Sequence, residues 1–232
     1  MAKKGTRNIP PFTFIDLFAG LGGFNQALST LGGRCVFASE KKEDLQRLYR
    51  LNFPNVVVKG DIENVDIEND IPAHDVLCAG FPCQPFSQAG NQEGFNDTQG
   101  RGNMFDFIIK IINFHRPRYV FLENVANLQT HDKGNTWKII KEKLETEHYV
   151  VHNRILSPHE FGFPQHRKRI YIIAIREDLE VTDYEFPKPT NAICDIHTII
   201  DEGDTNIQMI KQETRFQLDV WEEFLQNVAK SG

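Results

Sequence analysis

The sequence predicts an α/β protein with a mostly parallel sheet of seven strands, one of them antiparallel. Over residues 12–147, short apolar runs rich in β-branched residues alternate with segments of helical period, which is typical of parallel strands joined by helices. Glycines and polar residues follow several of these runs and separate the elements. The last two runs, 149–156 and 169–176, are joined by a short irregular segment, which favours an antiparallel pair at one end of the sheet.

Size and composition fit one such domain with an appendage. The 232 residues are 40% hydrophobic and 25% charged, which is ordinary for a globular protein. No apolar run is long enough to cross a bilayer, and the basic arm of residues 1–11 lacks the apolar core of a secretory signal. The four cysteines have neither the paired spacing of a zinc site nor the density of a disulfide scaffold. We therefore expect no metal, no membrane contact and a cytoplasmic location.

The net charge of −6 argues against a free-standing nucleic-acid binder, because Lys and Arg supply most non-specific affinity for phosphates. A polyanionic partner would have to be met by a local basic patch or by another chain. After the arm of residues 1–11, we expect an α/β domain over residues 12–176 and a C-terminal extension over residues 177–232.

The first predicted strand, 12–18, runs into the glycine-rich segment 19–23 and then into a helix over 24–31. Glycines let the backbone approach a ligand closely, and a helix N-terminus offers free amide donors, so this order predicts a cofactor cradle. In the dinucleotide fingerprint a third glycine would follow Gly20 and Gly22, but Asn25 occupies that position. The departure counts against NAD or FAD.

The second predicted strand, 34–39, ends at Glu40, whose spacing from Gly20 suits a carboxylate that accepts hydrogen bonds from both hydroxyls of a ribose. A solvated glutamate at the start of the next helix is an alternative of comparable weight. That helix covers 44–51.

The third predicted strand, 55–59, ends in a turn where Asp61 can accept from an exocyclic amine and Ile62 can cover a ring face. The glycine segment, Glu40 and Asp61 follow neighbouring strands and line one sheet edge. Together they predict an adenosine site.

The fourth predicted strand, 75–79, is followed by Gly80 and Pro82, which push Cys83 onto a loop. Ligands of open α/β sheets bind outside the carboxyl ends of the strands, so a thiol there is a candidate nucleophile. A cysteine packed in the core is the alternative, but a thiol between two prolines is poorly placed for packing. The polar, glycine-containing segment 88–103 is predicted to be a lid.

A helix over 104–113 leads to the fifth predicted strand, 118–122, which ends in the segment 123–125. A carboxylate just past an apolar strand is expected to be partly shielded from water, so Glu123 can hold or donate a proton near neutral pH. The alternative is an acid that caps the segment before the helix over 134–147.

The run 165–169, between the last two strands, is the densest basic cluster of the chain. Its arginines can contact phosphate or a base edge, although a solvated charge run is the usual outcome. Beyond it we expect a linker at 186–189, a short helix or strand at 196–200 and an amphipathic helix over 213–228. The apolar face of that helix has to be covered, and a partner surface would provide the cover.

Taken together, these residues resemble the cytosine-C5 DNA methyltransferases. The matching elements, in family order and spacing, are Asp16-Leu-Phe-Ala-Gly-Leu-Gly-Gly23, Glu40, Asp61, Gly80-Phe-Pro-Cys-Gln-Pro-Phe-Ser87, Glu123-Asn-Val125 and Gln165-His-Arg-Lys-Arg169. The resemblance covers residues 12 to 190, and its most specific part is the Pro-Cys-Gln and Glu-Asn-Val pair. It implies a Rossmann-like methyltransferase fold, S-adenosyl-L-methionine as methyl donor, and a cytosine flipped out of double-stranded DNA. It also implies a role in a restriction-modification system.

The resemblance gives each group a role. Cys83, as thiolate, adds to C6 of cytosine, while protonated Glu123 hydrogen-bonds N3 and the exocyclic amine. C5 then takes the methyl group from the sulfonium, and loss of the C5 proton expels the thiolate. Arg169 matches the family residue that binds O2, and Arg167 and the lid from 84 to 103 hold the flipped nucleotide and its phosphates.

The implied contacts fall into two sets. Cofactor contacts are Asp16, Phe18, Ala19, Gly20, Leu21, Gly22, Gly23, Glu40, Lys41, Asp61, Ile62, Gly80 and Pro82. Nucleic-acid contacts are Gln84, Ser87, Asn124, Val125, Gln165, Arg167 and Arg169. Lys41 departs from many relatives, which have an apolar or aromatic residue there that packs on adenine.

The family's last two motifs and its target recognition region, which follow the arginine motif, are absent from the sequence. We therefore expect a catalytic half that is completed by a second chain or by a missing C-terminal part. The nearest alternative is a tRNA cytosine-C5 methyltransferase, which shares Cys83 and Glu123. A non-catalytic subunit that retains the fold is the alternative from a different class.

Overall fold

The computed structural model describes residues 11–82, 104–181, 183–190, 192–201 and 209–230. The chain divides into two compact units, with the boundary between Cys194 and Asp195. None of the helices in these ranges is long and apolar enough to cross a membrane.

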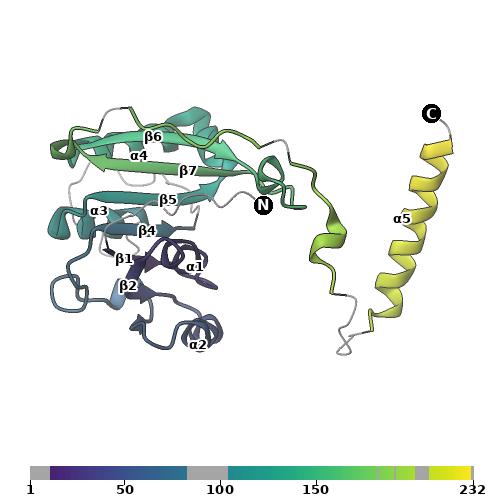
Figure 1. Ribbon diagram of the computed structural model, residues 1–232, viewed down its shortest axis with the longest axis horizontal. Helices are drawn as coiled ribbons and strands as arrows, with labels where there is room; N and C mark the ends of the chain where they lie inside the picture. The colour runs from purple at the N-terminus through teal and green to yellow at the C-terminus, as the bar shows by residue number, and fades with distance from the viewer. Residues whose placement is uncertain (1–10, 83–103, 182, 191, 202–208, 231–232) are drawn as a thin grey trace. The chain divides into compact units, whose positions relative to one another are not determined.

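The first unit is built on a seven-stranded sheet with the strand order β3-β2-β1-β4-β5-β7-β6 (Figure 1). The strands are β1 (Phe12–Leu17), β2 (Gly33–Ser39), β3 (Val58–Lys59), β4 (Val76–Gly80), β5 (Tyr119–Val125), β6 (Tyr149–Leu156) and β7 (Arg169–Arg176). Neighbouring strands pair in parallel except β7, which is antiparallel to both β5 and β6. The predicted sheet, with its one antiparallel strand, is confirmed.

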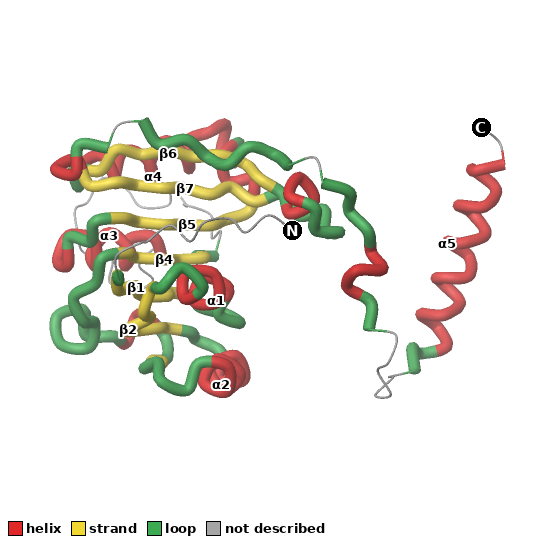
Figure 2. Tube along the Cα trace, in the orientation of Figure 1, coloured by secondary structure: helices red, strands yellow, loops and turns green. Residues whose placement is uncertain are grey.

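Helices cover both faces of this sheet (Figure 2). They are α1 (Gly23–Ser29), α2 (Glu43–Asn52), α3 (Met104–His115) and α4 (Asn135–Thr146), with 3-10 turns at Ile62–Asn64, Ala126–Gln129, His131–Gly134, Pro158–Phe161 and Glu177–Leu179. Successive side chains of a strand point to opposite faces, and β1 follows this rule. Phe14 packs with Phe24 of α1, whereas Ile15 and Leu17 belong to the large core that α3 and α4 complete.

The third strand is shorter than the predicted run 55–59. The first residues of the predicted run belong to the turn that follows α2, in which the N–H of Val56 donates to the carbonyl of Phe53 at 3.1 Å. Regular pairing with β2 therefore begins only at Val58.

The order of the strands creates a switch point between β1 and β4. The chain passes from β1 to β2 on one side, then returns to place β4 on the other side of β1. In such sheets the loops after the two central strands diverge and leave a crevice at their carboxyl ends. The predicted functional groups follow these strands.

Residues 177–194, assigned to the extension by the sequence, belong to the first unit. The ring of Tyr184 lies 5.6 Å from that of His152 in β6, and the N–H of Thr190 donates to the carbonyl of Glu160 at 2.9 Å. This segment returns along β6 toward the loop that joins β6 to β7.

The second unit contains a 3-10 turn at Ile196–Ile199 and the helix α5 (Gln212–Lys230). An apolar row along α5 consists of Phe216, Val220, Phe224 and Val228, which are 51–70% exposed. Their spacing of four residues places them on one face, and the predicted amphipathic helix is confirmed.

Candidate active site

The groups singled out by the sequence follow five parallel strands and meet at one edge of the sheet. The loop after β1 holds the glycines, Glu40 and Asp61 follow β2 and β3, Gly80 ends β4, and Glu123 lies near the end of β5. The parallel register places these ends side by side.

The glycine loop has a conformation that demands glycine at one position and leaves its backbone open at another. Gly22 has a φ of 86°, and a Cβ there would lie 2.4 Å from a ring carbon of Phe53. A Cβ added at Gly20 or Gly23 would meet no described atom within 4 Å. Leu21, between them, is 61% exposed. A ligand can therefore approach this backbone closely.

Glu40 ties two loops together beneath that opening. Its Oε2 accepts from the N–H of Gly20 at 2.8 Å, and its Oε1 accepts from the N–H of Lys42 at 2.9 Å. The residue is 8% exposed. Each carboxylate oxygen can accept a further hydrogen bond, so Glu40 can fix the loop and still meet a hydroxyl of a ligand.

Asp61 is paired with Lys41, the residue that departs from the family pattern. Nζ of Lys41 lies 2.6 Å from Oδ2 of Asp61. Burial opposes ionisation of Asp61, but hydrogen bonds from Lys41 and from the N–H of Glu63 outweigh it and lower its pKa. Lys41 thus neutralises the carboxylate instead of providing an apolar surface.

Ile62, which was expected to cover a ring face, is buried. It is 3% exposed and belongs to the main hydrophobic core, together with Ile15 and Phe37. The 3-10 turn that starts at Ile62 directs this side chain into the protein, and its contact with a ring of a ligand stays a prediction.

Asp16 lies under the glycine loop and is fully buried. Its Oδ2 accepts from the hydroxyl of Tyr49 at 3.2 Å, and that hydroxyl accepts from Nδ2 of Asn25 at 2.9 Å. Burial raises the pKa of Asp16 to about 7 against the opposing effect of the Tyr49 hydrogen bond, and the charge of Glu40 adds to the rise. Asp16 therefore supports the loop from inside, through a network that the sequence did not reveal.

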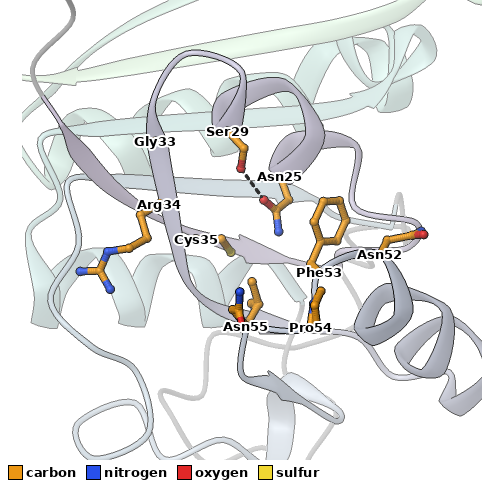
Figure 3. Close-up of a pocket in the computed structure, with 10 residues that line it drawn as sticks. Asn25, Ser29, Gly33, Arg34, Cys35, Asn52, Phe53, Pro54 and Asn55 are labelled. Atoms are coloured by element: carbon orange, nitrogen blue, oxygen red, sulfur yellow. Dashed lines mark hydrogen bonds between the residues drawn. The ribbon is translucent and has the colours of Figure 1, made fainter.

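This network reaches a pocket of about 480 Å³ at the amino end of β2 (Figure 3). The hydroxyl of Ser29 donates to Oδ1 of Asn25 at 2.8 Å, drawn as a dashed line. The lining is completed by Gly33, Arg34, Cys35, Asn52, Phe53, Pro54, Asn55 and Val56. Because Gly33 is the first residue of β2, the pocket lies away from the carboxyl edge and is separate from the candidate site.

Glu123 lies against the end of the strand that leads to Cys83. It is paired with Gly80 in the β4–β5 register, and a Cβ added at Gly80 would lie 3.5 Å from Oε2 of Glu123. Its Oε1 is 2.9 Å from Nε of Arg169, and these two side chains are 28% and 18% exposed. The acid and the guanidinium are thus held together at the edge, partly shielded from water.

Asn124, which was expected to contact nucleic acid, makes a structural hydrogen bond within the protein. Its Nδ2 donates to the carbonyl of Phe81 at 2.8 Å, and the residue is 3% exposed. It therefore joins the strand of Glu123 to the segment Gly80–Pro82. Val125 is 39% exposed and remains accessible.

Cys83, Gln84, Ser87 and the predicted lid lie outside the described residues. Among the described cysteines, Cys35 and Cys78 are buried. Burial raises the pKa of Cys35 to about 11 and that of Cys78 well above its ordinary value, so both thiols stay protonated near neutral pH. No cluster of three or more His, Cys, Asp or Glu side chains in the described ranges could hold a metal ion.

The residues of the basic run differ in their exposure. Gln165 and Arg167 are exposed, whereas Arg169 is the first residue of β7 and is half-buried. The backbone N–H of Arg167 donates to Oγ of Ser157 at 2.9 Å. The Ser-x-x-Glu spacing from Ser157 to Glu160 is the sequence signature of a capping box, but it does not reveal the hydrogen bond from Arg167.

Comparison with known families shows which family the chain belongs to. The family model described as C-5 cytosine-specific DNA methylase matches residues 12–231. The chain belongs to this family. The resemblance carried by the glycine segment and by the segments around Cys83 and Glu123 is thereby confirmed.

Curated methylases of the family are similar over most of this chain. The type II methyltransferase M.HhaI of Haemophilus parahaemolyticus is 46% identical over 176 residues, which cover 76% of this chain and 53% of that protein. The type II methyltransferase M.MspI of a Moraxella species is 45% identical over 194 residues, which cover 84% of this chain and 45% of that protein. The chain therefore spans about half the length of these relatives.

Solved structures support the fold of this chain. A mutant of DNMT2 from Spodoptera frugiperda superposes with a TM-score of 0.59 and 23% identity, covering 87% of this chain and 61% of that chain. The methyltransferase EhMeth of Entamoeba histolytica gives a TM-score of 0.62 and 18% identity, covering 86% and 62%. The expected Rossmann-like fold of S-adenosylmethionine-dependent methyltransferases is confirmed.

Proposed function

We propose that this chain is the catalytic part of a DNA (cytosine-5-)-methyltransferase that acts in a restriction-modification system. One observation carries the proposal: the carboxylate of Glu123, paired with Arg169 at 2.9 Å, lies beside Gly80 at the sheet edge that also holds the glycine loop. Two chemical groups suited to a pyrimidine are thus close to a cradle suited to a nucleoside. The type II methyltransferases among its relatives support the same reaction.

The glycine loop and the acidic strand ends fit S-adenosyl-L-methionine. The open backbone at Gly20 and Gly23 allows close approach, and Glu40 has acceptor capacity left for ribose hydroxyls. Asp61 would accept a hydrogen bond from the adenine amine while it remains in its ion pair with Lys41. The cofactor supplies an electrophilic methyl group when it is bound.

The remaining chemistry belongs to the chain's own residues. Cys83, as thiolate, would add to C6 of the cytosine, because C5 is a poor nucleophile until the ring is activated. O2, N3 and the amine of cytosine lie in a row along one edge of the base. Arg169 and Glu123, which are already neighbours, would bind O2 and the N3–amine side of that edge. Glu123 has to be protonated to donate to N3.

Duplex DNA is the proposed substrate, and base flipping would bring one cytosine to this edge. The exposed basic residues of 165–168 are available for phosphates, but the net charge of −6 opposes tight binding of DNA by this chain alone. A second chain or a further segment would supply target recognition. The apolar row of α5 is a surface on which such a component can dock.

Methyl transfer from labelled S-adenosylmethionine to duplex DNA and to tRNA tests this proposal. We expect label on DNA; label on tRNA alone would favour the tRNA enzyme of the same family. Binding of S-adenosylhomocysteine, measured by calorimetry, is the independent check on the cofactor site. A chain that binds the cofactor product but labels neither substrate, even with its copurifying partner, would support the non-catalytic alternative.

A further inference from the structure

The loop between β6 and β7 is closed by one buried hydroxyl. Ser157 directly follows β6 and is 3% exposed. Its Oγ accepts from the N–H of Arg167 at 2.9 Å and lies 2.8 Å from Nδ1 of His159. Its own N–H donates to Oε2 of Glu160 at 2.7 Å, as part of a capping box. A hydroxyl with these bonds holds the two ends of the loop together.

The two arginines of the basic run depend on different anchors. Arg169 is paired with Val125 across the β5–β7 ladder, and its side chain is held by Glu123. Arg167 precedes β7, so no strand pairing fixes its backbone. The hydrogen bond from its N–H to Ser157 is the contact that places it relative to the sheet.

The rest of the loop has supports that do not involve this hydroxyl. The N–H of His159 donates to the carbonyl of Gln165 at 3.1 Å, and Sγ of Cys194 donates to the carbonyl of His159 at 3.1 Å. The N–H of Thr190 donates to the carbonyl of Glu160 at 2.9 Å. Loss of the hydroxyl should therefore release Arg167 without dismantling the loop.

We propose that Ser157 is a positioning residue for Arg167: its buried hydroxyl fixes the backbone from which the exposed guanidinium reaches the nucleic acid. This inference rests on the proposed function, because it takes the contact of Arg167 with nucleic acid from there. Ser157 positions Arg167, whereas Arg169 is positioned by the pairing of β7 with β5.

Amide hydrogen exchange, followed residue by residue by NMR, tests the anchoring without any catalysis. In Ser157→Ala the amide of Arg167 should exchange roughly tenfold faster, as expected when one net hydrogen bond is lost. Amides of β7 from Ile170 to Ile175 should keep their protection. Ser157→Thr retains the hydroxyl and should restore slow exchange. Cys194→Ala is the matched control, because it removes a hydrogen bond to the same loop from outside it and should leave the exchange of Arg167 unchanged. Unchanged exchange at Arg167 in Ser157→Ala would overturn the inference.

Kinetics on duplex DNA test the consequence, in whichever preparation transfers methyl groups. Ser157→Ala should raise KM for DNA about fivefold to tenfold and leave kcat within about twofold, since one phosphate-contacting side chain loses its fixed position. When Ser157→Ala is combined with Arg167→Ala, the double variant should show no higher KM for DNA than Arg167→Ala alone. Additive losses would mean that Ser157 acts elsewhere and would refute its role toward Arg167. If the wild-type protein transfers no methyl group even with its copurifying partner, the proposed function fails, while the exchange experiment still decides the anchoring.

Discussion

The buried carboxyl of Asp16 should make the stability of this protein depend on pH, and Asp16→Asn should remove that part of the dependence. Folding raises the pKa of Asp16 from 3.8 to about 7, chiefly because burial disfavours the charged form. The folded chain thus binds this proton more tightly than the unfolded chain. The stability associated with the protonated group is complete below about pH 4 and is lost between pH 4 and pH 7.

The size of this loss follows from the two pKa values. A difference of that extent corresponds to at most about 4 kcal/mol of unfolding free energy at pH 8 relative to pH 4. The Asn side chain keeps an oxygen that can accept from Tyr49 and carries no titrating group. Relative to wild type, Asp16→Asn should therefore gain stability as the pH rises over this range.

Urea denaturation at several pH values between 4 and 8 measures this difference. Subtracting the wild-type free energies from those of Asp16→Asn cancels the other titrating groups, which both proteins share. Tyr49→Phe is the second variant: it removes the hydrogen bond that favours the ionised carboxyl, so its stability should fall more steeply with pH than that of wild type. A difference between wild type and Asp16→Asn that stays constant within about 1 kcal/mol would refute the reasoning.

Three further predictions concern the candidate site. Gly22→Ala should destabilise the fold by about 2 kcal/mol or more, because its Cβ would lie 2.4 Å from the ring of Phe53 at a left-handed φ of 86°. Thermal denaturation measures this loss of stability. Gly23→Ala is the control, because its Cβ meets no described atom within 4 Å. Glu123→Gln should lower kcat for methyl transfer about a hundredfold, because the amide cannot give up a proton. Binding of S-adenosylhomocysteine, measured by calorimetry, should stay unchanged. A kcat equal to that of wild type would remove Glu123 from the mechanism. Cys83→Ala should abolish covalent capture of DNA that contains 5-fluorocytosine, seen as loss of a slow band on a denaturing gel; undiminished capture would identify another nucleophile.

The sequence was sufficient for the parts of the fold that depend on local pattern. Alternating apolar runs and helical segments predicted the strands and their order of appearance, and the irregular segment between 156 and 169 predicted the antiparallel partner strand. The glycine loop and Glu40 could also be recognised, because a strand, a glycine turn and an acidic strand end occur at a fixed spacing.

Other features depend on contacts between distant parts of the chain. Tyr49 looks like any apolar position of an amphipathic helix, and only the packing of α2 brings its hydroxyl to Asp16. Lys41 seemed a poor replacement for an apolar residue, and its ion pair with Asp61 emerges only when β2 and β3 are aligned. The burial of Ile62 in the core could not be predicted either, because a turn sequence does not reveal which way a side chain points.

The antiparallel direction of β7 has a consequence for how the chain leaves the catalytic unit. β7 begins at Arg169, beside Glu123, and therefore ends at the far edge of the sheet. Residues 177–194 retrace that distance along the outermost strand and finish at Cys194, which is bonded to the carbonyl of His159. The polypeptide thus departs from the same rim at which a cytosine would enter. Under the proposed function, a DNA-reading segment attached beyond residue 194 would therefore start at that rim.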